Sequence, residues 1–236
     1  MKLFIAVPSH TGQICADTSQ AIANNMAILC KCGIDCYYDV ELGEAYVPRA
    51  RNSLVKRFLN SDCDAIVFID YDVAFRKDAI IDLVISDKDI VGGTYPKKKD
   101  ETDFPIQVSV PKVEVDGLLK VDLLPSGFIM IKRCVFEKMK AKIPIRTDSD
   151  LNMDWYYDTG FLFENDNRWW GEDPAFCRRC AMANIDMWCY TDITFSHTGP
   201  RIKIANYDQW SKEKLAINNI SSCITRYIET LEEDGK

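Results

Sequence analysis

Strand-like apolar segments alternate with amphipathic helical patterns over the first 70 residues, and this alternation most constrains the fold. The strand-like segments are KLFIAVPS (residues 2–9), IDCYYDV (34–40) and DAIVFID (64–70). Between them, residues 16–33 and 47–60 place apolar side chains at helical spacing. Strands that are buried on both faces of a parallel sheet carry near-continuous apolar runs. The pattern predicts an α/β fold with a central, mostly parallel sheet flanked by helices.

The second half of the chain is less regular. It predicts strands over residues 89–96, 127–132, 186–190 and 193–197, and helices over 133–142 and 173–185. Asp116-Gly117 is a typical hairpin turn and predicts a small antiparallel element. The stretch from Pro144 to Gly171 has no clear period, so we expect a long functional loop. We expect a single domain over residues 1–205 and a helical extension over 206–236.

Composition restricts the function classes. The chain has 236 residues, of which 47% are hydrophobic, and no stretch approaches the ~20 apolar residues of a membrane helix. The first residues lack a signal-peptide cleavage pattern, and ten cysteines then indicate reduced thiols, so we expect a cytoplasmic protein without membrane insertion. Cys177 and Cys180 have helical spacing, which favours two buried thiols over a zinc site. A net charge of −7 argues against a broad nucleic-acid surface.

Two acids, Asp70 and Asp72, end the third strand-like segment. If the strand continues through them, residues i and i+2 point to the same side. Both carboxylates would then face one point at the carboxyl end of the sheet, where open α/β sheets bind ligands. Oxygen ligands of this kind suit Mg²⁺ or Mn²⁺, which also hold phosphates. Two solvated loop acids are the alternative.

Cations and histidines elsewhere fit the same site. Arg49 and Arg51 lie in the first turn of the helix expected over residues 47–60, where cations oppose the helix dipole. Their place there is explained by a bound anion such as a diphosphate, or by side chains that simply extend into water. Of the two histidines of the chain, His10 follows the first expected strand and His197 ends the last one. His197 is a candidate metal ligand, and a structural role is the alternative.

The segment RWWGEDPAF, residues 168–176, contains the last candidates. Glu172 or Asp173 could serve as a general base beside an aromatic platform of Trp169 and Trp170, which suits a sugar ring. Asp173 precedes Pro174, so a plain N-cap of the next helix is the alternative role.

Taken together, these motifs resemble the metal-dependent glycosyltransferases of the GT-A fold. The order matches over roughly residues 1–200: VPS after the first strand, RARN on a helix, FIDYD as the DxD motif, PSGFIMIKR as the sugar-facing strand, WGED at a helix start, and a late histidine. The resemblance is greatest to compact glycosyltransferases of bacteriophages and large algal viruses. It implies a nucleotide-binding half at about residues 1–100 and an acceptor-binding half at about 101–205.

The resemblance also implies residue roles. Asp72 and His197 would bind Mn²⁺ or Mg²⁺, with Asp70 at the ribose or donor sugar and close to the metal. Asp173, or its neighbour Glu172, would deprotonate the acceptor hydroxyl, and Trp169 and Trp170 would bind the acceptor. The expected donor-binding residues are Pro8, Ser9, His10, Arg49, Arg51, Asp70, Tyr71, Ser126 and Gly127.

The implied activity is hexosyl or deoxyhexosyl transfer from a nucleotide sugar, with UDP as the default, to a glycan, a protein or a modified DNA base. We expect inversion at the anomeric carbon, and retention is the alternative. A haloacid-dehalogenase-type phosphatase also uses D-x-D after an apolar strand, but on its first strand. A nucleotide-sugar pyrophosphorylase would need a Gly-rich basic loop after the first strand, and a sugar-binding module would need no metal site. The sequence does not specify the base, sugar, acceptor or oligomeric state.

Overall fold

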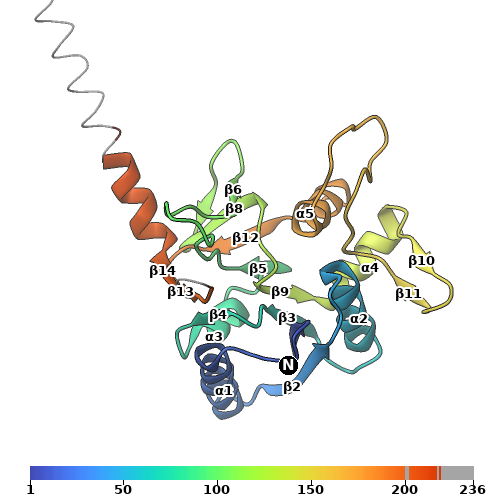
Figure 1. The fold of residues 1–236 in the computed structure, drawn as a ribbon, viewed down its shortest axis with the longest axis horizontal. Coiled ribbons are helices and arrows are strands. Elements are labelled where there is room, and N and C mark those ends of the chain that lie inside the picture. Colours follow the sequence, from blue (N-terminus) through green and yellow to red (C-terminus); the bar gives the residue numbers. More distant parts are fainter. Residues whose placement is uncertain (200–201, 217, 219–236) are drawn as a thin grey trace, which may run out of the picture.

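The computed structural model describes residues 1–199, 202–216 and 218 (Figure 1). Its helices are α1 (Ala16–Lys31), α2 (Val47–Leu59), α3 (Ala79–Ile85), α4 (Arg133–Lys142) and α5 (Glu172–Met182). The strands of the main sheet are β1 (Lys2–Ser9), β2 (Asp35–Leu42), β3 (Ala65–Ile69), β5 (Ile90–Gly92), β6 (Gln107–Val108), β7 (Glu114–Val115), β8 (Leu118–Leu123), β9 (Phe128–Lys132) and β12 (Met187–Tyr190). Two small sheets contain β10 (Thr147–Asp148) with β11 (Met153–Asp154), and β4 (Val73–Phe75) with β13 (Thr194–His197) and β14 (Lys203–Asn206).

The main sheet has the order β2-β1-β3-β9-β5-β12-β8-β6, with β7 paired to β8. Strands β2, β1 and β3 are parallel, and β5 and β12 run in the same direction. Strand β9 is antiparallel to both β3 and β5, between which it lies. Its amino end therefore meets the carboxyl ends of its neighbours. This inserted strand is what brings residues 126–127 beside the end of β3.

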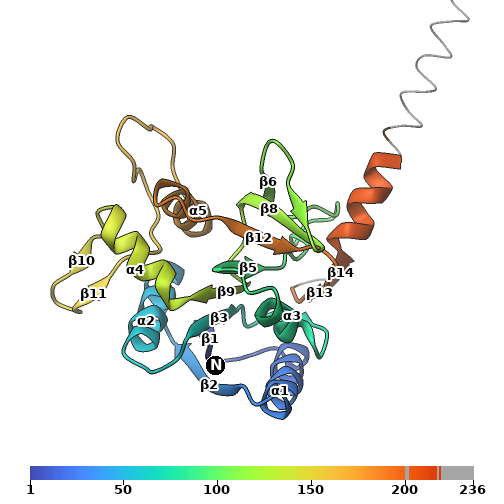
Figure 2. The same ribbon diagram turned by 180° about the vertical axis from the view of Figure 1, so that it is seen from behind.

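Successive side chains of the central strands point to opposite faces of the sheet and pack into two separate hydrophobic cores. Phe4 and Ala6 of β1 pack on one face with residues of α2, α4 and α5, whereas Leu3 and Ile5 pack on the other face with residues of α1 and α3. Figures 1 and 2 show the resulting three layers from opposite sides. Because both faces of β3 are covered, all its residues are buried, as its uninterrupted apolar sequence requires.

The expected α/β class is confirmed, including the antiparallel hairpin element. Asp116 and Gly117, both with positive φ (52° and 75°), connect β7 to β8. The expected long loop differs in part, because residues 147–154 form the β10–β11 hairpin. In the proposed C-terminal extension, residues 207–216 are helical; 217 and 219–236 lie outside the described residues. The division into two halves stays a prediction.

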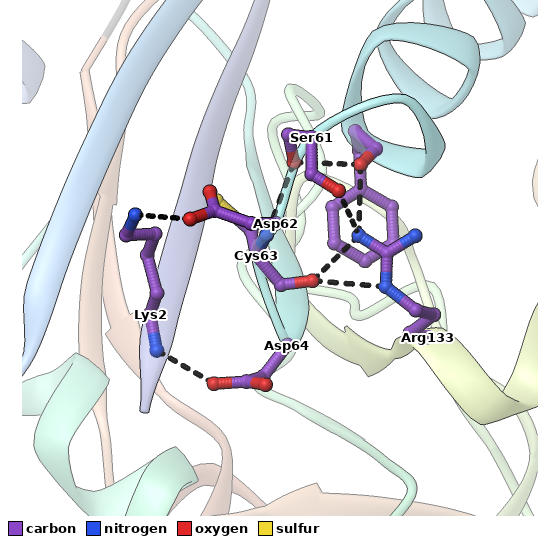
Figure 3. Close-up of polar contacts among 7 residues, drawn as sticks. Lys2, Ser61, Asp62, Cys63, Asp64 and Arg133 are labelled. Carbon is purple, nitrogen blue, oxygen red and sulfur yellow. Dashed lines mark hydrogen bonds and ion pairs between the residues drawn. The ribbon is translucent and has the colours of Figure 1, made fainter.

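Arg133 holds the loop between α2 and β3 in place by hydrogen bonds to its backbone carbonyl groups (Figure 3). Its guanidinium donates to the carbonyl oxygens of Leu59 (2.9 Å), Ser61 (2.9 Å) and Cys63 (2.7 Å from Nη2). These oxygens belong to the end of α2 and the loop after it, where helical carbonyls lack helical partners. On the other side of the loop, Lys2 Nζ contacts Asp62 at 2.6 Å. These contacts hold the loop that leads into β3 against α4 and β1.

Replacing Arg133 with Met should lower the free energy of unfolding by about 2–4 kcal/mol, because several carbonyls would lose a charged donor. Urea unfolding at neutral pH measures this loss. Lys138→Met is the matched control, since Lys138 forms one exposed ion pair with Asp89, and its loss should cost less than about 1 kcal/mol. Equal losses in the two variants would contradict the role of Arg133.

Candidate functional site

The two acids of the DxD motif lie in a turn just after β3, and their carboxylates have different partners. Strand β3 ends at Ile69, and the turn is closed by a hydrogen bond from Val73 N to Asp70 O (3.1 Å). The expectation of an extended strand through both acids is therefore wrong. Asp70 contacts the interior of the protein, whereas Asp72 contacts a loop and the small β4–β13–β14 sheet.

Asp70 is held by a buried arginine. Arg51 Nη2 donates to Asp70 Oδ1 at 2.9 Å, and Arg51 Nη1 donates to Ser126 O at 3.1 Å. The hydroxyl of Tyr95 donates to Asp70 Oδ2 at 3.2 Å. Only 2% of the Arg51 surface is exposed. Burial alone would lower the pKa of Arg51, but Asp70 and Asp173 outweigh it and raise that pKa, so the guanidinium stays charged.

Gly127 allows this cluster to close. Its carbonyl oxygen accepts from Asp70 N at 2.9 Å, which joins the start of β9 to the end of β3. A Cβ atom at this position would lie 2.6 Å from Tyr95 Cζ and would also clash with the Asp70 carboxylate. The glycine that the sequence places before β9 is thus required by a close approach of two side chains.

Asp72 forms the second part of the site with Lys98 and His197. Lys98 Nζ forms an ion pair with Asp72 Oδ2, and His197 Nε2 lies 3.6 Å from Asp72 Oδ1. The pairing of His197 with Val73, between β13 and β4, places the imidazole there. Burial acts to raise the pKa of Asp72, but His197 and Lys98 outweigh it, and the pKa lies below its usual value. Asp72 is therefore an ionised, buried carboxylate.

The tautomer of His197 indicates what this pair can bind. His197 Nδ1 lies 2.7 Å from Pro96 O, and because a carbonyl only accepts, Nδ1 carries the hydrogen. In the neutral ring, Nε2 then presents a lone pair toward a carboxylate oxygen. A cation between the two atoms would satisfy both, and a backbone carbonyl behind the imidazole is the usual support of a metal ligand. The residues therefore fit a divalent ion that takes its other ligands from water and phosphate.

Within the described ranges, however, no group of three or more His, Cys, Asp or Glu side chains is arranged to hold a metal ion. Asp70, the third expected ligand, points to Arg51 and Tyr95 instead of toward Asp72 and His197. A metal ion here would have only Asp72 and His197 as its protein ligands among the described residues.

A cavity of about 250 Å³ opens between these groups at the carboxyl ends of β1 and β3. Its wall is formed by Pro8, His10, Glu44, Val47, Ala50, Arg51, Asp70, Tyr71, Asp72, Lys98, Glu172 and His197. The structure thus brings together eight residues expected from the sequence. Ser126 and Gly127 lie behind Arg51 and Asp70, Ser9 is buried, and Arg49 faces Glu44 with 3.3 Å between Nε and Oε2.

Sequence reasoning missed Glu44, Tyr95 and Lys98 as parts of this site. Tyr95 and Lys98 follow β5, whose carboxyl end lies at the same edge of the sheet as that of β3. That position was the available signal. Lys98 belongs to a run of three lysines, residues 97–99, and contacts a carboxylate of the site.

A larger cavity, of about 800 Å³, lies at the opposite edge of the sheet. It is bordered by Lys2, Asp35 and Asp62, at the amino ends of β1 and β2 and in the loop before β3. Ligands of open α/β sheets bind outside the carboxyl ends of the strands. We therefore assign the functional site to the smaller cavity with the convergent charges.

Asp173 lies behind the cavity, in the first turn of α5. The N-cap of this helix is Gly171, so the alternative role of Asp173 as the cap is wrong. Its Oδ1 atom is buried without a hydrogen-bond partner among the described residues. Burial raises the pKa of the Asp173 carboxyl to about 6, against the opposing effect of Arg51 and with a further increase from Glu172. Such a carboxyl can exchange a proton near neutral pH.

The two adjacent tryptophans have different environments. Trp169 is 64% exposed and meets Phe161 edge-to-face, with 5.4 Å between ring centres. Trp170 is half-buried: its Nε1 donates to Asp166 at 3.0 Å, and Arg168 lies over its ring at 4.6 Å. Trp169 therefore offers a free aromatic surface, whereas Trp170 holds the loop together.

The cysteines give no sign of a metal site. The nine cysteines described are all free, and Cys177 and Cys180 are buried on α5 as expected. Burial is the main reason that the pKa values of both thiols are raised. No helix in the described part of the chain is long and apolar enough to cross a membrane.

Comparison with proteins of known structure shows which fold this chain shares. No family model and no curated protein matches the sequence. A197 from STIV aligns with a TM-score of 0.53 and 18% identity, over 87% of this chain and 95% of A197. An overlap that spans nearly all of both chains at such low identity shows a shared fold. The fold is of the GT-A type. The resemblance inferred from the motifs is thus confirmed for the architecture.

Two further structures are similar over less of their length. S. aureus TarS has a TM-score of 0.42 and 12% identity, over 76% of this chain and 33% of TarS. A glycosyltransferase involved in the glycosylation of the major capsid of PBCV-1 has a TM-score of 0.34 and 13% identity, over 58% of this chain and 64% of the other.

Replacing Gly127 with Ala should lower the free energy of unfolding by about 1–3 kcal/mol, because the methyl group would push Tyr95 and Asp70 apart. Urea unfolding measures this cost. Gly171→Ala is the control: its Cβ would make only an ordinary contact of 3.8 Å with Pro174, and the φ of Gly171 is −78°. If both variants unfold like the original protein, the close approach at Gly127 is not a constraint.

Proposed function

We propose that this protein is a glycosyltransferase that moves a hexosyl or deoxyhexosyl group from a nucleotide sugar, most simply a UDP-sugar, to an acceptor hydroxyl. The observation that carries the proposal is the arrangement of Asp72, His197 and Lys98 around a cavity at the carboxyl end of β3. Such a site combines a carboxylate and an imidazole for a cation with the ammonium group of Lys98, which is paired with that carboxylate. A nucleoside diphosphate needs both kinds of charge partner when it leaves.

The donor would lie along the cavity wall. Pro8, Ser9, His10 and Tyr71 are proposed to contact the nucleotide; His10 and Tyr71 already face each other edge-to-face, with ring centres 5.9 Å apart. Asp70, Ser126 and Gly127 are proposed to contact the ribose or the sugar. Arg51 and Arg49 keep their proposed role toward the diphosphate. Arg51 is paired with Asp70. We therefore propose that Arg51 also acts on the donor indirectly, by orienting the Asp70 carboxylate.

Asp72 and His197 would hold Mn²⁺ or Mg²⁺. Bound there, the ion would neutralise charge that develops on the departing diphosphate. The Lys98 side chain is 34% exposed, and its ammonium group is paired with the Asp72 carboxylate. We propose that Lys98 moves from Asp72 to a phosphate oxygen when the donor binds. The ammonium would then contribute a second positive charge to the leaving group.

Asp173 would be the general base, with Glu172 beside it at the cavity. A base must be ionised to accept the proton of the acceptor hydroxyl, and a pKa of about 6 keeps Asp173 largely ionised at pH 7.5 while leaving it basic enough to work. Attack from the face opposite the diphosphate gives inversion. Retention, the alternative, would need no base there. The exposed ring of Trp169 would support the acceptor, with Trp170 holding its loop.

The phosphatase alternative would use Asp70 as a nucleophile that attacks phosphorus. Both oxygens of Asp70 are engaged, one by Arg51 and the other by Tyr95, which weighs against that role. The direct test of the proposal is incubation with a panel of UDP-, GDP- and dTDP-sugars and Mn²⁺, with release of the nucleotide as the readout. No release from any donor, in the presence of a range of acceptors, would contradict it.

The cation site predicts opposite effects of two substitutions. Asp72→Ala should abolish the stabilisation that UDP with Mn²⁺ gives in thermal unfolding, because one of two protein ligands is lost. Lys98→Met should instead tighten Mn²⁺ binding by about tenfold, measured by electron paramagnetic resonance without nucleotide, because a competing cation is removed from Asp72. Asp62→Ala, at an exposed acid remote from the site, is the control. Unchanged Mn²⁺ affinity in all three variants would refute the site.

Asp173 predicts a pH dependence. Transfer should fall about tenfold per pH unit below pH 6, since protonation of the carboxyl removes the base. Asp173→Asn should lower kcat by about 10²-fold and leave donor binding unchanged. It should also abolish the decrease in transfer rate below pH 6, which is the acid limb of the pH profile. Glu172→Gln is the matched control and should keep the limb. Product NMR should show an inverted anomeric configuration; a retained configuration would exclude Asp173 as this base.

A further inference from the structure

A third cavity, of about 530 Å³, lies along α5, beyond the cavity proposed to bind the donor. It is formed by the loop after α4, the second half of α5 and residues 162–164, on the side of the molecule where α4, α5 and the β10–β11 hairpin gather (Figure 2). Its wall contains Ile143, Pro144, Arg146, Leu162, Phe163, Glu164, Arg178, Arg179 and Met182. Three arginines against one glutamate make this wall basic in a chain of net charge −7.

The arginines of this cavity are incompletely neutralised by the protein. Arg179 is 7% exposed, and its Nη2 lies 3.8 Å from Asp158 Oδ2. Arg146 Nη1 lies 3.9 Å from the same oxygen, so two guanidinium groups share one carboxylate beyond hydrogen-bond distance. Arg178 forms no ion pair with any residue in the described part of the chain. A buried guanidinium without a close anion is costly unless a ligand supplies one.

The rest of the environment of Arg179 fixes the group without neutralising it. Its Nη1 donates to the carbonyl of Tyr156 at 3.1 Å, and its guanidinium lies 5.8 Å from the ring centre of Phe163. Burial lowers the pKa of Arg179, and the positive charge of Arg146 acts in the same direction. The group is therefore held in place with hydrogen-bonding capacity toward the cavity.

The helix also sets the distance from the proposed base. Arg179 follows Asp173 by six residues on α5, which at 1.5 Å per residue is roughly 9 Å along the helix axis. Arg146 additionally borders a cavity of about 320 Å³ that contains Trp155 and Tyr46, two aromatic rings suited to stacking on sugars.

We propose that the cavity bounded by Arg146, Arg178 and Arg179 binds an anionic group, a carboxylate or a phosphate ester, on an acidic acceptor glycan. The proposal rests on the proposed glycosyl transfer, since it names the class of acceptor. Arginine is suited to either anion because its donors form a fork that matches two oxygens. The apolar part of the wall, with Leu162, Phe163 and Met182, favours one anionic group in a sugar chain over the repeated phosphates of a nucleic acid.

The test uses the whole protein in EDTA, without donor. Digalacturonic acid and glucose 6-phosphate are titrated against the neutral controls galactobiose and glucose, and binding is measured by saturation-transfer NMR and calorimetry. Both acidic probes should bind at least tenfold more tightly than the neutral ones. In a parallel titration without EDTA, saturating UDP with Mn²⁺ should leave the acidic probes bound, because the donor cavity is separate.

Arg146→Ala/Arg178→Ala should weaken the acidic probes by about tenfold or more; it removes two exposed arginines and leaves the buried Arg179. Lys31→Ala/Lys77→Ala is the charge-matched control: both lysines are exposed and outside every cavity named here, so affinity should be unchanged. The proposal is overturned if neutral probes bind equally well, if both double variants behave alike, or if UDP with Mn²⁺ displaces the acid. It is also overturned if duplex DNA binds more tightly with a steep salt dependence.

The two proposals fail in different ways. If the original protein binds no nucleotide sugar, glycosyl transfer is refuted whatever the acidic probes do. If nucleotide-sugar binding survives in Arg146→Ala/Arg178→Ala and the acidic probes show no preference, only the acceptor class is refuted.

Discussion

The buried ion pair between Arg51 and Asp70 is the interaction on which the rest of the site depends. Arg51 is the fifth residue of α2, in its second turn, and reaches under the end of β3, where it contacts Asp70 and the backbone of Ser126. Leaving either charge without its partner in such a place typically costs about 3–5 kcal/mol. The pair therefore fixes three elements, α2, β3 and the start of β9, relative to one another. It also places a positive charge near Asp173, which limits how far burial raises the pKa of that carboxyl.

Antiparallel insertions then complete a site that parallel strands alone would leave open. Strand β9 lies between β3 and β5 and runs antiparallel to both. Its amino end therefore places Gly127 beside Asp70. In the small sheet, β13 runs antiparallel to β4 and delivers His197 to Asp72. The two acids are only two residues apart in the sequence. Asp70 nevertheless contacts residues packed at the main sheet, whereas Asp72 lies beside the small sheet. This separation lets one acid remain structural while the other stays available to a cation.

The charges form two zones that fit a reaction between a donor and an acidic acceptor. Around Asp72, one carboxylate faces Lys98 and His197 at the end of β3. Farther along α5, arginines outnumber acids around a more apolar hollow. Asp173 lies between these zones at the beginning of the same helix, and its Oδ1 has no hydrogen-bond partner among the described residues. The second zone is net basic, whereas the wall of the first zone combines Arg51 and Lys98 with four carboxylates, which suits an anionic donor that brings its own cation.

The sequence by itself determined the α/β class, the strand β3, the helix α2 and the position of Asp70, Asp72 and His10 after strands at one sheet edge. These follow from local rules, because apolar periodicity and strand polarity act within a few residues. Only the tertiary structure decided which partner each side chain has. Asp70 turned away from Asp72 because β3 stops at Ile69, and Lys98, Tyr95 and the Arg146–Arg178–Arg179 cavity arise from loops whose neighbours are distant in the chain. Such contacts depend on strand order and loop packing, which no local pattern encodes.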